Sequence, residues 1–141
     1  MIWVVLDTNI IVSALLQPLG PSAQILILAL GGALKLCISG KIYAEYEEVI
    51  SRPRFARDPA VIAATLQSIR ENAFWVKPSS RLKVCADPDD DVFLECAEEA
   101  RASYLVTGNV RHFPPSWNDT TVITPRRMIE ILGTGAESKI I

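Results

Sequence analysis

Cysteine and histidine are scarce in this sequence, and their scarcity excludes several kinds of site. The three cysteines, Cys37, Cys85 and Cys96, are odd in number, and no two of them have the spacing of zinc ligands. We therefore expect neither a disulfide framework nor a thiolate metal centre, but free buried thiols in a cytoplasmic protein. Because the sequence contains only one histidine, His112, catalysis that relies on a pair of imidazoles is excluded.

Long apolar runs and a large excess of positive charge are also absent. The most membrane-like stretch, Ala23–Ile38, is too short to cross a bilayer and contains Gly31, Gly32 and Lys35. The first residues lack a basic segment, and Asp7 interrupts their apolar run, so we expect neither a signal peptide nor membrane association. A net charge of −2 argues against coating nucleic acid through bulk positive charge, but it does not exclude locally arranged charge.

What the sequence does contain is an alternation of strand and helix patterns along 141 residues, half of them hydrophobic. Continuous apolar runs predict buried parallel strands, and capping residues and prolines mark helix starts. We expect strands at Ile2–Leu6, Leu34–Ile38, Tyr104–Val106 and Val122–Ile123, with short extended pieces at Phe74–Val76 and Leu82–Val84. We expect one helix that ends at Leu16 and is capped by Thr8 or Asn9, followed by helices at Ala23–Leu30, Gly40–Ile50, Pro59–Asn72, Val92–Arg101 and Pro125–Leu132.

This order of elements predicts an α/β fold, a three-layer α/β/α sandwich around a mostly parallel central sheet. We find no linker or repeat that would divide the chain, so we expect a single domain over residues 1–132. The last residues, 133–141, have the sequence GTGAESKII and are expected to form a flexible tail that a partner orders.

Polar residues occur where the predicted strands end. Asp7 ends the first strand, and Thr107 and Asn109 follow the strand Tyr104–Val106. In a parallel sheet these positions meet at one edge, where Glu45 and Asp91 from two helices can join them. Crowded carboxylates resist ionisation, and a divalent cation removes that penalty. Hard oxygen ligands favour Mg²⁺ or Mn²⁺, and such sites most often carry out phosphoryl chemistry.

Three segments together resemble the motifs of the PIN-domain ribonucleases. The first is VLDTNIIVSALL near the start, the second ISGKIYAEYEEVISRPRF, and the third DPDDDVFLECAEEARASYLVTGN. They occur in order and at suitable separations between residues 4 and 109, and the last strand and helix fit the same fold. The resemblance implies a metal-dependent endoribonuclease, often the toxin of a toxin–antitoxin pair, as in the VapC group.

The resemblance also implies roles for individual residues. The metal ligands and catalytic groups are expected at Asp7, Glu45 and Asp91, with Asn109 as a further metal ligand. Asp90 competes with Asp91, because an error of one residue is easy in DPDDD, and Glu48 is the alternative to Glu45 one helical turn along. The expected supporting residues are Thr8, Asn9, Ser13, Asp90 and Thr107, with Asn9 orienting Asp7 or another ligand.

Asn109 departs from the family pattern, in which many members have an aspartate. An amide oxygen can coordinate a cation, but it contributes no charge, so we expect one firm metal site and a weaker second one. This departure keeps open an alternative, in which the protein is a catalytically weakened PIN-like module that holds RNA or a protein partner. A phosphatase with an aspartate nucleophile is a further rival, but the second aspartate of that motif is replaced by Asn9.

The sequence offers fewer indications of binding partners. Arg52, Arg54 and Arg111 are candidate contacts to RNA phosphates, although a solvated surface residue is the more usual interpretation of each arginine taken singly. The helix Ala23–Leu30 is apolar nearly all round, which is typical of a helix covered by the core or by another chain. We therefore expect a homodimer and, from the family resemblance, a cognate antitoxin protein.

Overall fold

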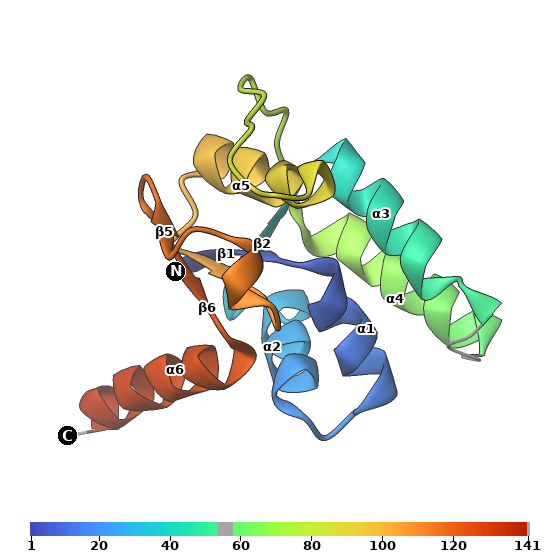
Figure 1. The fold of residues 1–141 in the computed structure, drawn as a ribbon. Coiled ribbons are helices and arrows are strands. Elements are labelled where there is room, and N and C mark those ends of the chain that lie inside the picture. Colours follow the sequence, from blue (N-terminus) through green and yellow to red (C-terminus); the bar gives the residue numbers. More distant parts are fainter. Residues whose placement is uncertain (54–57, 141) are drawn as a thin grey trace.

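Within residues 1–53 and 58–140, the part of the chain that the computed structural model describes, six strands form one sheet (Figure 1). The strands are β1 (Ile2–Leu6), β2 (Leu34–Ile38), β3 (Phe74–Trp75), β4 (Tyr104–Val106), β5 (Ser116–Trp117) and β6 (Thr120–Ile123). Their order is β3-β2-β1-β4-β6-β5, and neighbouring strands are parallel except β5 and β6. The prediction of an α/β fold with a mostly parallel sheet is confirmed.

Helices cover both faces of the sheet (Figure 1). In the described residues they are α1 (Thr8–Leu16), α2 (Pro21–Leu30), α3 (Gly40–Ile50), α4 (Pro59–Asn72), α5 (Pro88–Ala100) and α6 (Pro125–Ile140), with a short 3-10 helix at Val110–His112. Helix α5 packs on β1, β2 and β4, whereas α2 lies on the other side in contact with β2, α1 and α6. Helices α3 and α4 pack together, and α3 also contacts α1 and α5.

The centre of the sheet is the most deeply buried part of the molecule. Val4, Val5 and Leu6 of β1 are fully buried, as expected for a strand covered on both faces. From β1 the chain builds β2 and β3 on one side, and then returns to build β4 and β6 on the other. The winding therefore reverses between β1 and β4, and in open parallel sheets ligands bind beyond the carboxyl ends of the strands at such a reversal.

Local capping explains most helix starts. The Ser39 hydroxyl accepts a 3.3 Å hydrogen bond from the backbone of Ile42, and Asp58 caps α4 through the backbone of Ala60 at 2.8 Å. Helix α2 begins at Pro21 and not at Ala23, because a proline is favourable in the first helical turn.

Two further helix boundaries and two extended segments differ from the prediction. Helix α5 begins at Pro88, one turn before the predicted start at Val92, because Asp87 caps it through the backbone of Asp89. The predicted extended piece Leu82–Val84 is not a strand, and β5 was not predicted. The last helix continues to Ile140 and does not end at Leu132, since the glycines at positions 133 and 135 weaken a helix without stopping it.

Within residues 1–53 and 58–140, no single helix is both long enough and apolar enough to cross a membrane. Helices α1 and α2 meet those limits only when taken together, and they are separated by a bend of 108°.

A buried tyrosine joins α3 to the end of β1. Tyr46 is fully buried, and its hydroxyl donates a hydrogen bond to the backbone carbonyl of Leu6, the residue before Asp7. Since this bond fixes the end of β1 from the side of α3, it also positions the carboxylate that follows.

We expect Tyr46→Phe to lower the free energy of unfolding by about 1 kcal/mol, because a buried carbonyl loses a partner. For a chain of this size the melting temperature should fall by about 3–5 °C in a calorimetric scan. Tyr43→Phe is the matched control on the same helix, since no hydrogen bond to the Tyr43 hydroxyl is found in the described residues. An equal loss in both variants would contradict the role of the Tyr46 hydroxyl.

Candidate active site

Asp7 lies at the reversal point of the sheet and is held there by hydrogen bonds with the last residue of β4 and with the residue after it. Its backbone N–H donates to the carbonyl of Val106 at 3.0 Å. The hydroxyl of Thr107, which is fully buried, donates to Asp7 Oδ2 at 2.7 Å. Only 7% of Asp7 is exposed, so its carboxylate has a fixed position between the ends of the two strands.

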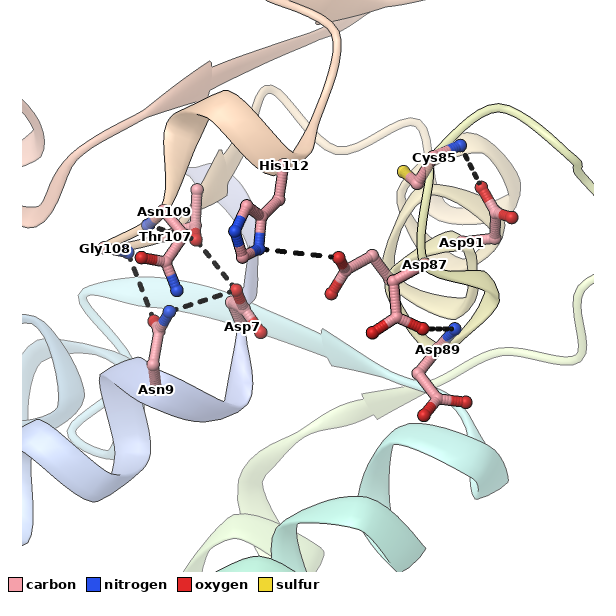
Figure 2. Close-up of polar contacts among 11 residues, drawn as sticks. Asp7, Asn9, Cys85, Asp87, Asp89, Asp91, Thr107, Gly108, Asn109 and His112 are labelled. Carbon is pink, nitrogen blue, oxygen red and sulfur yellow. Dashed lines mark hydrogen bonds and ion pairs between the residues drawn. The ribbon is translucent and has the colours of Figure 1, made fainter.

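Asn9 ties Asp7 to the turn after β4. Its side-chain amide donates to Asp7 Oδ2 at 3.3 Å, and its Oδ1 accepts from the backbone of Gly108 at 3.2 Å. The backbone of Asn109 donates to the Thr107 hydroxyl at 2.9 Å, so the same threonine organises the turn and Asp7. Figure 2 shows these residues gathered around Asp7 at the start of α1.

Glu45 reaches the same region from α3. Its Oε2 accepts a hydrogen bond from the hydroxyl of Thr8, the residue after Asp7. Glu48, the alternative one turn along, is exposed and forms an ion pair with Arg52 at 2.8 Å. Of these two acids, Glu45 is therefore the one that lies beside Asp7.

The two competing aspartates of α5 have different surroundings. Asp90 Oδ2 lies 3.6 Å from His112 Nδ1, and the side chain is 17% exposed. Asp91 is 4% exposed, and its Oδ1 accepts hydrogen bonds from the backbone of Val84 at 3.1 Å and of Cys85 at 2.8 Å. Figure 2 shows His112 and Asp7 on one side of the first turn of α5, and Asp91 turned away toward Cys85. The geometry thus favours Asp90 over Asp91 as the third acid.

Asp91 belongs to a row of carboxylates on α5 that holds residues 76–86, which we call the strap. Asp91, Glu95 and Glu99 are spaced four residues apart and share one helix face. Glu95 Oε2 accepts from the backbone of Leu82 at 2.9 Å. Glu99 Oε1 accepts from the backbone of Ser79 at 3.0 Å and from its hydroxyl at 2.8 Å. These acids give the strap, which lacks regular structure, partners for its backbone.

Burial and mutual repulsion disfavour ionisation of the acids near Asp7. Burial raises the pKa of Asp7, and the charge of Glu45 adds to this, while Thr107 and the backbone of Thr8 oppose it. Burial also raises the pKa of Glu45, with further contributions from Asp89 and Asp90.

The third acid shows the same behaviour. Burial, then the charges of Asp7 and Asp87, raise the pKa of Asp90 to about 6, against a partial lowering by His112. Each acid thus responds to the charge of a neighbour, so Asp7, Glu45 and Asp90 form one electrostatic group.

The donor set fits a hard divalent cation, although the acids do not form a closed cage. In residues 1–53 and 58–140, no group of three or more His, Cys, Asp or Glu side chains is close enough to enclose a metal ion. Mg²⁺ is usually held by only one or two carboxylates together with waters and substrate phosphates. Carboxylates that raise one another's pKa values are also those whose repulsion a cation would relieve.

A pocket of about 430 Å³ opens beside Asp90. It lies between the end of the strap and the turn after β4, and its lining includes Val84, Asp87, Asp90, Arg111 and His112. Local sequence patterns assigned no role to His112. Its position three residues after Asn109, within the turn that carries the site, was the one sequence signal that could have placed His112 at the site.

The other residues singled out by the sequence lie as follows. Ser13 is half-buried on α1, and the described residues give its hydroxyl no hydrogen bond. Arg52 is engaged by Glu48 through two hydrogen bonds, of 3.2 and 2.8 Å. Arg111 is exposed at the pocket beside Asp90. Arg54 falls outside the described residues.

Comparison with known proteins points to one family. A family model described as a PIN domain matches residues 3–111. The uncharacterised protein MJ1680 of Methanocaldococcus jannaschii is 29% identical over 111 residues, which are 77% of this chain and 71% of the relative. The crystal structure of VapBC2 from Rickettsia felis bound to a DNA fragment from their promoter superimposes with a TM-score of 0.56 at 16% identity, over 87% of this chain and 98% of that one. The likeness to the Rickettsia felis structure shows a shared fold.

The contrast between Asp90 and Asp91 can be tested by their effects on stability. We expect Asp91→Ala to lower the free energy of unfolding in urea by about 2 kcal/mol, because two backbone donors of the strap lose their acceptor. Asp90→Ala should leave the free energy of unfolding unchanged or raise it, because the substitution removes repulsion with Asp7. The amide protons of Val84 and Cys85 should exchange faster only in Asp91→Ala. The reverse order of stabilities would contradict this assignment.

The raised pKa of Asp90 predicts a pH dependence of stability in metal-free buffer. The pKa is about 6 in the fold against an ordinary value of 3.8, so the folded state binds more protons between these values. The stability that the protonated carboxyl contributes is present below 3.8 and is lost as the pH rises through about 6.

Melting temperatures of wild type and Asp90→Asn should therefore be compared from pH 4 to 7 in EDTA. We expect the variant to gain stability relative to wild type as the pH rises. Asp119→Asn, on an exposed turn, controls for the loss of one surface carboxylate. A wild-type-to-Asp90→Asn difference that does not change with pH would refute the electrostatic coupling.

Proposed function

Because the chain belongs to the PIN-domain family, we propose that it is a metal-dependent endoribonuclease and the toxin component of a toxin–antitoxin pair. PIN domains are generally nucleases that use divalent metals. The observation that carries the proposal is the position of Asp7, which Thr107 and Asn9 hold at the reversal point of the sheet with Glu45 and Asp90 in electrostatic contact.

Asp7, Glu45 and Asp90 are the residues that would hold Mg²⁺ or Mn²⁺. Asp91 was the third acid expected from the family motif, but its carboxylate serves the strap, so the proposal moves this role to Asp90. Asn109 would add a neutral oxygen, which supports a weaker second site at most. When bound, the cation supplies charge that activates water and stabilises the negative charge developing on the phosphate.

The protein's own residues then have three tasks. Thr107 and Asn9 fix the Asp7 carboxylate, and Thr8 fixes Glu45, so the acids need no rearrangement when substrate arrives. Asp90 is partly exposed beside the 430 Å³ pocket, which supports a role in accepting a proton from the attacking water. Attack on phosphorus expels the 3′ oxygen, so the products carry 5′-phosphate and 3′-hydroxyl ends.

The toxin role and its partners rest on the fold and on exposed apolar residues. The Rickettsia felis protein of the same fold is a VapBC2 complex, and for the present chain we infer a cognate antitoxin by analogy. Leu19, in the turn before α2, is 94% exposed and Ile27, on α2, is 66% exposed, which supports coverage by a second copy in a homodimer.

A second candidate function is favoured by Asn109 alone. Loss of one carboxylate from the family pattern is what a catalytically weakened PIN-like module would show, in which the site holds RNA or a protein without cleavage. The retention of Asp7, Glu45 and Asp90 in one electrostatic group supports the enzyme instead.

The purified protein should cleave single-stranded RNA in Mg²⁺ or Mn²⁺, and EDTA should abolish cleavage reversibly. We expect Asp7→Asn, Glu45→Gln and Asp90→Asn each to lower kcat/KM by about 100-fold or more, since each removes charge from the cation site. Glu47→Gln, an exposed neighbour of Glu45 on α3, is the matched control and should retain activity. RNA bound but left intact by the wild type in both metals would favour the binding module.

A further inference from the structure

A second pocket, of about 320 Å³, lies at the carboxyl ends of β2 and β3. Lys41 comes from the first turn of α3, and Lys77 and Arg81 come from the strap. We call it the basic pocket; Ser39, Ser80 and Glu95 complete the part of its lining that matters here.

The charges of the basic pocket are not neutralised within the described residues. No ion pair of Lys41, Lys77 or Arg81 is found there, and all three side chains are exposed. Glu95 is the one acid in the lining, but it is 8% exposed and its Oε2 accepts a hydrogen bond from the backbone of Leu82. The pocket therefore presents a net positive charge in a protein whose overall charge is negative.

The basic pocket and the group formed by Asp7, Glu45 and Asp90, which we call the acidic site, lie on the same edge of the sheet. Lys41 precedes Glu45 by four residues on α3, so the two share one helix face and are separated by about 6 Å along the axis. The strap also joins the two regions, because its first half lines the basic pocket and its last residues line the pocket beside Asp90. The row of acids on α5 holds both halves in place.

On the basis of the function proposed above, we propose that the basic pocket binds a backbone phosphate of the RNA strand, away from the phosphate that is cleaved. A polyanion that approaches Asp7, Glu45 and Asp90 meets repulsion, and neighbouring cations offset it. Lys and Arg side chains are the groups that bind phosphates through charge-assisted hydrogen bonds. An acidic peptide could bind the basic pocket through the same chemistry, but its binding would not involve the acidic site on the same edge of the sheet. An RNA substrate, in contrast, must contact both the basic pocket and the acidic site.

The double variant Lys77→Gln/Arg81→Gln tests this assignment, with Lys83→Gln as the matched control. Lys83 lies on the same strap, is exposed and does not line the basic pocket. Affinity for a fluorescent single-stranded RNA is measured in EDTA at several salt concentrations. We expect the double variant to bind about tenfold more weakly. The slope of log K against log salt should be smaller by about 0.7 for each RNA phosphate that the variant no longer neutralises.

Cleavage in Mn²⁺ is measured on the same variants. The double variant should raise KM and leave kcat near the wild-type value, while Lys83→Gln behaves as wild type in both assays. Thermal melting checks that each variant is folded.

Two outcomes would overturn the phosphate subsite: equal RNA affinity in wild type and the double variant, or an equal loss in Lys83→Gln. Tighter binding of hexaglutamate than of RNA, abolished in the double variant, would also overturn it in favour of a protein partner. The proposed nuclease is tested separately, because it fails if RNA is bound at the basic pocket but never cleaved by the wild type.

Discussion

The structure of the site depends on keeping one carboxylate in a buried place where two strands end. Asp7 is almost fully covered, and removing a carboxylate from water costs several kcal/mol unless hydrogen bonds replace the lost hydration. Thr107 and Asn9 provide them, and both come from segments whose positions β4 and β1 determine. The pairing of β1 with β4 therefore both forms the core of the sheet and positions Asp7.

Helix α5 uses its acids in two opposite ways. Asp91, Glu95 and Glu99 accept hydrogen bonds from backbone N–H groups of the strap, so their charges stabilise a segment without regular structure. Within the described residues Asp90, next to Asp91 in the chain, gains no such backbone partner and instead meets the charges of Asp7 and Asp87. A cation site requires negative charges that repel one another when no cation is bound. The same repulsion that lowers the stability of the free protein at Asp90 would therefore favour binding of the cation in the proposed function.

Much of the fold could be predicted because its signals are local. The apolar runs of β1, β2 and β4 and the capped ends of α3 and α4 agree with the structure to the residue. The choice between Asp90 and Asp91 could not be predicted from the motif, because it depends on contacts with the strap. The spacing of Asp91, Glu95 and Glu99 was nevertheless visible, and it indicates a shared face that excludes Asp90.

Contacts between distant segments decide the rest of the site. His112 meets Asp90, and Thr8 meets Glu45, only because α5 and α3 converge on the carboxyl edge of the sheet. The strap depends on α5 in the same way, since Asp91 fixes its end near the acidic site and Glu95 and Glu99 fix the part beside Lys77 and Arg81. In the proposed nuclease α5 thus carries one acid of the site, Asp90, and also holds the part of the strap beside the cations, so the spacing between Asp90 and these cations follows from the hydrogen bonds between α5 and the strap.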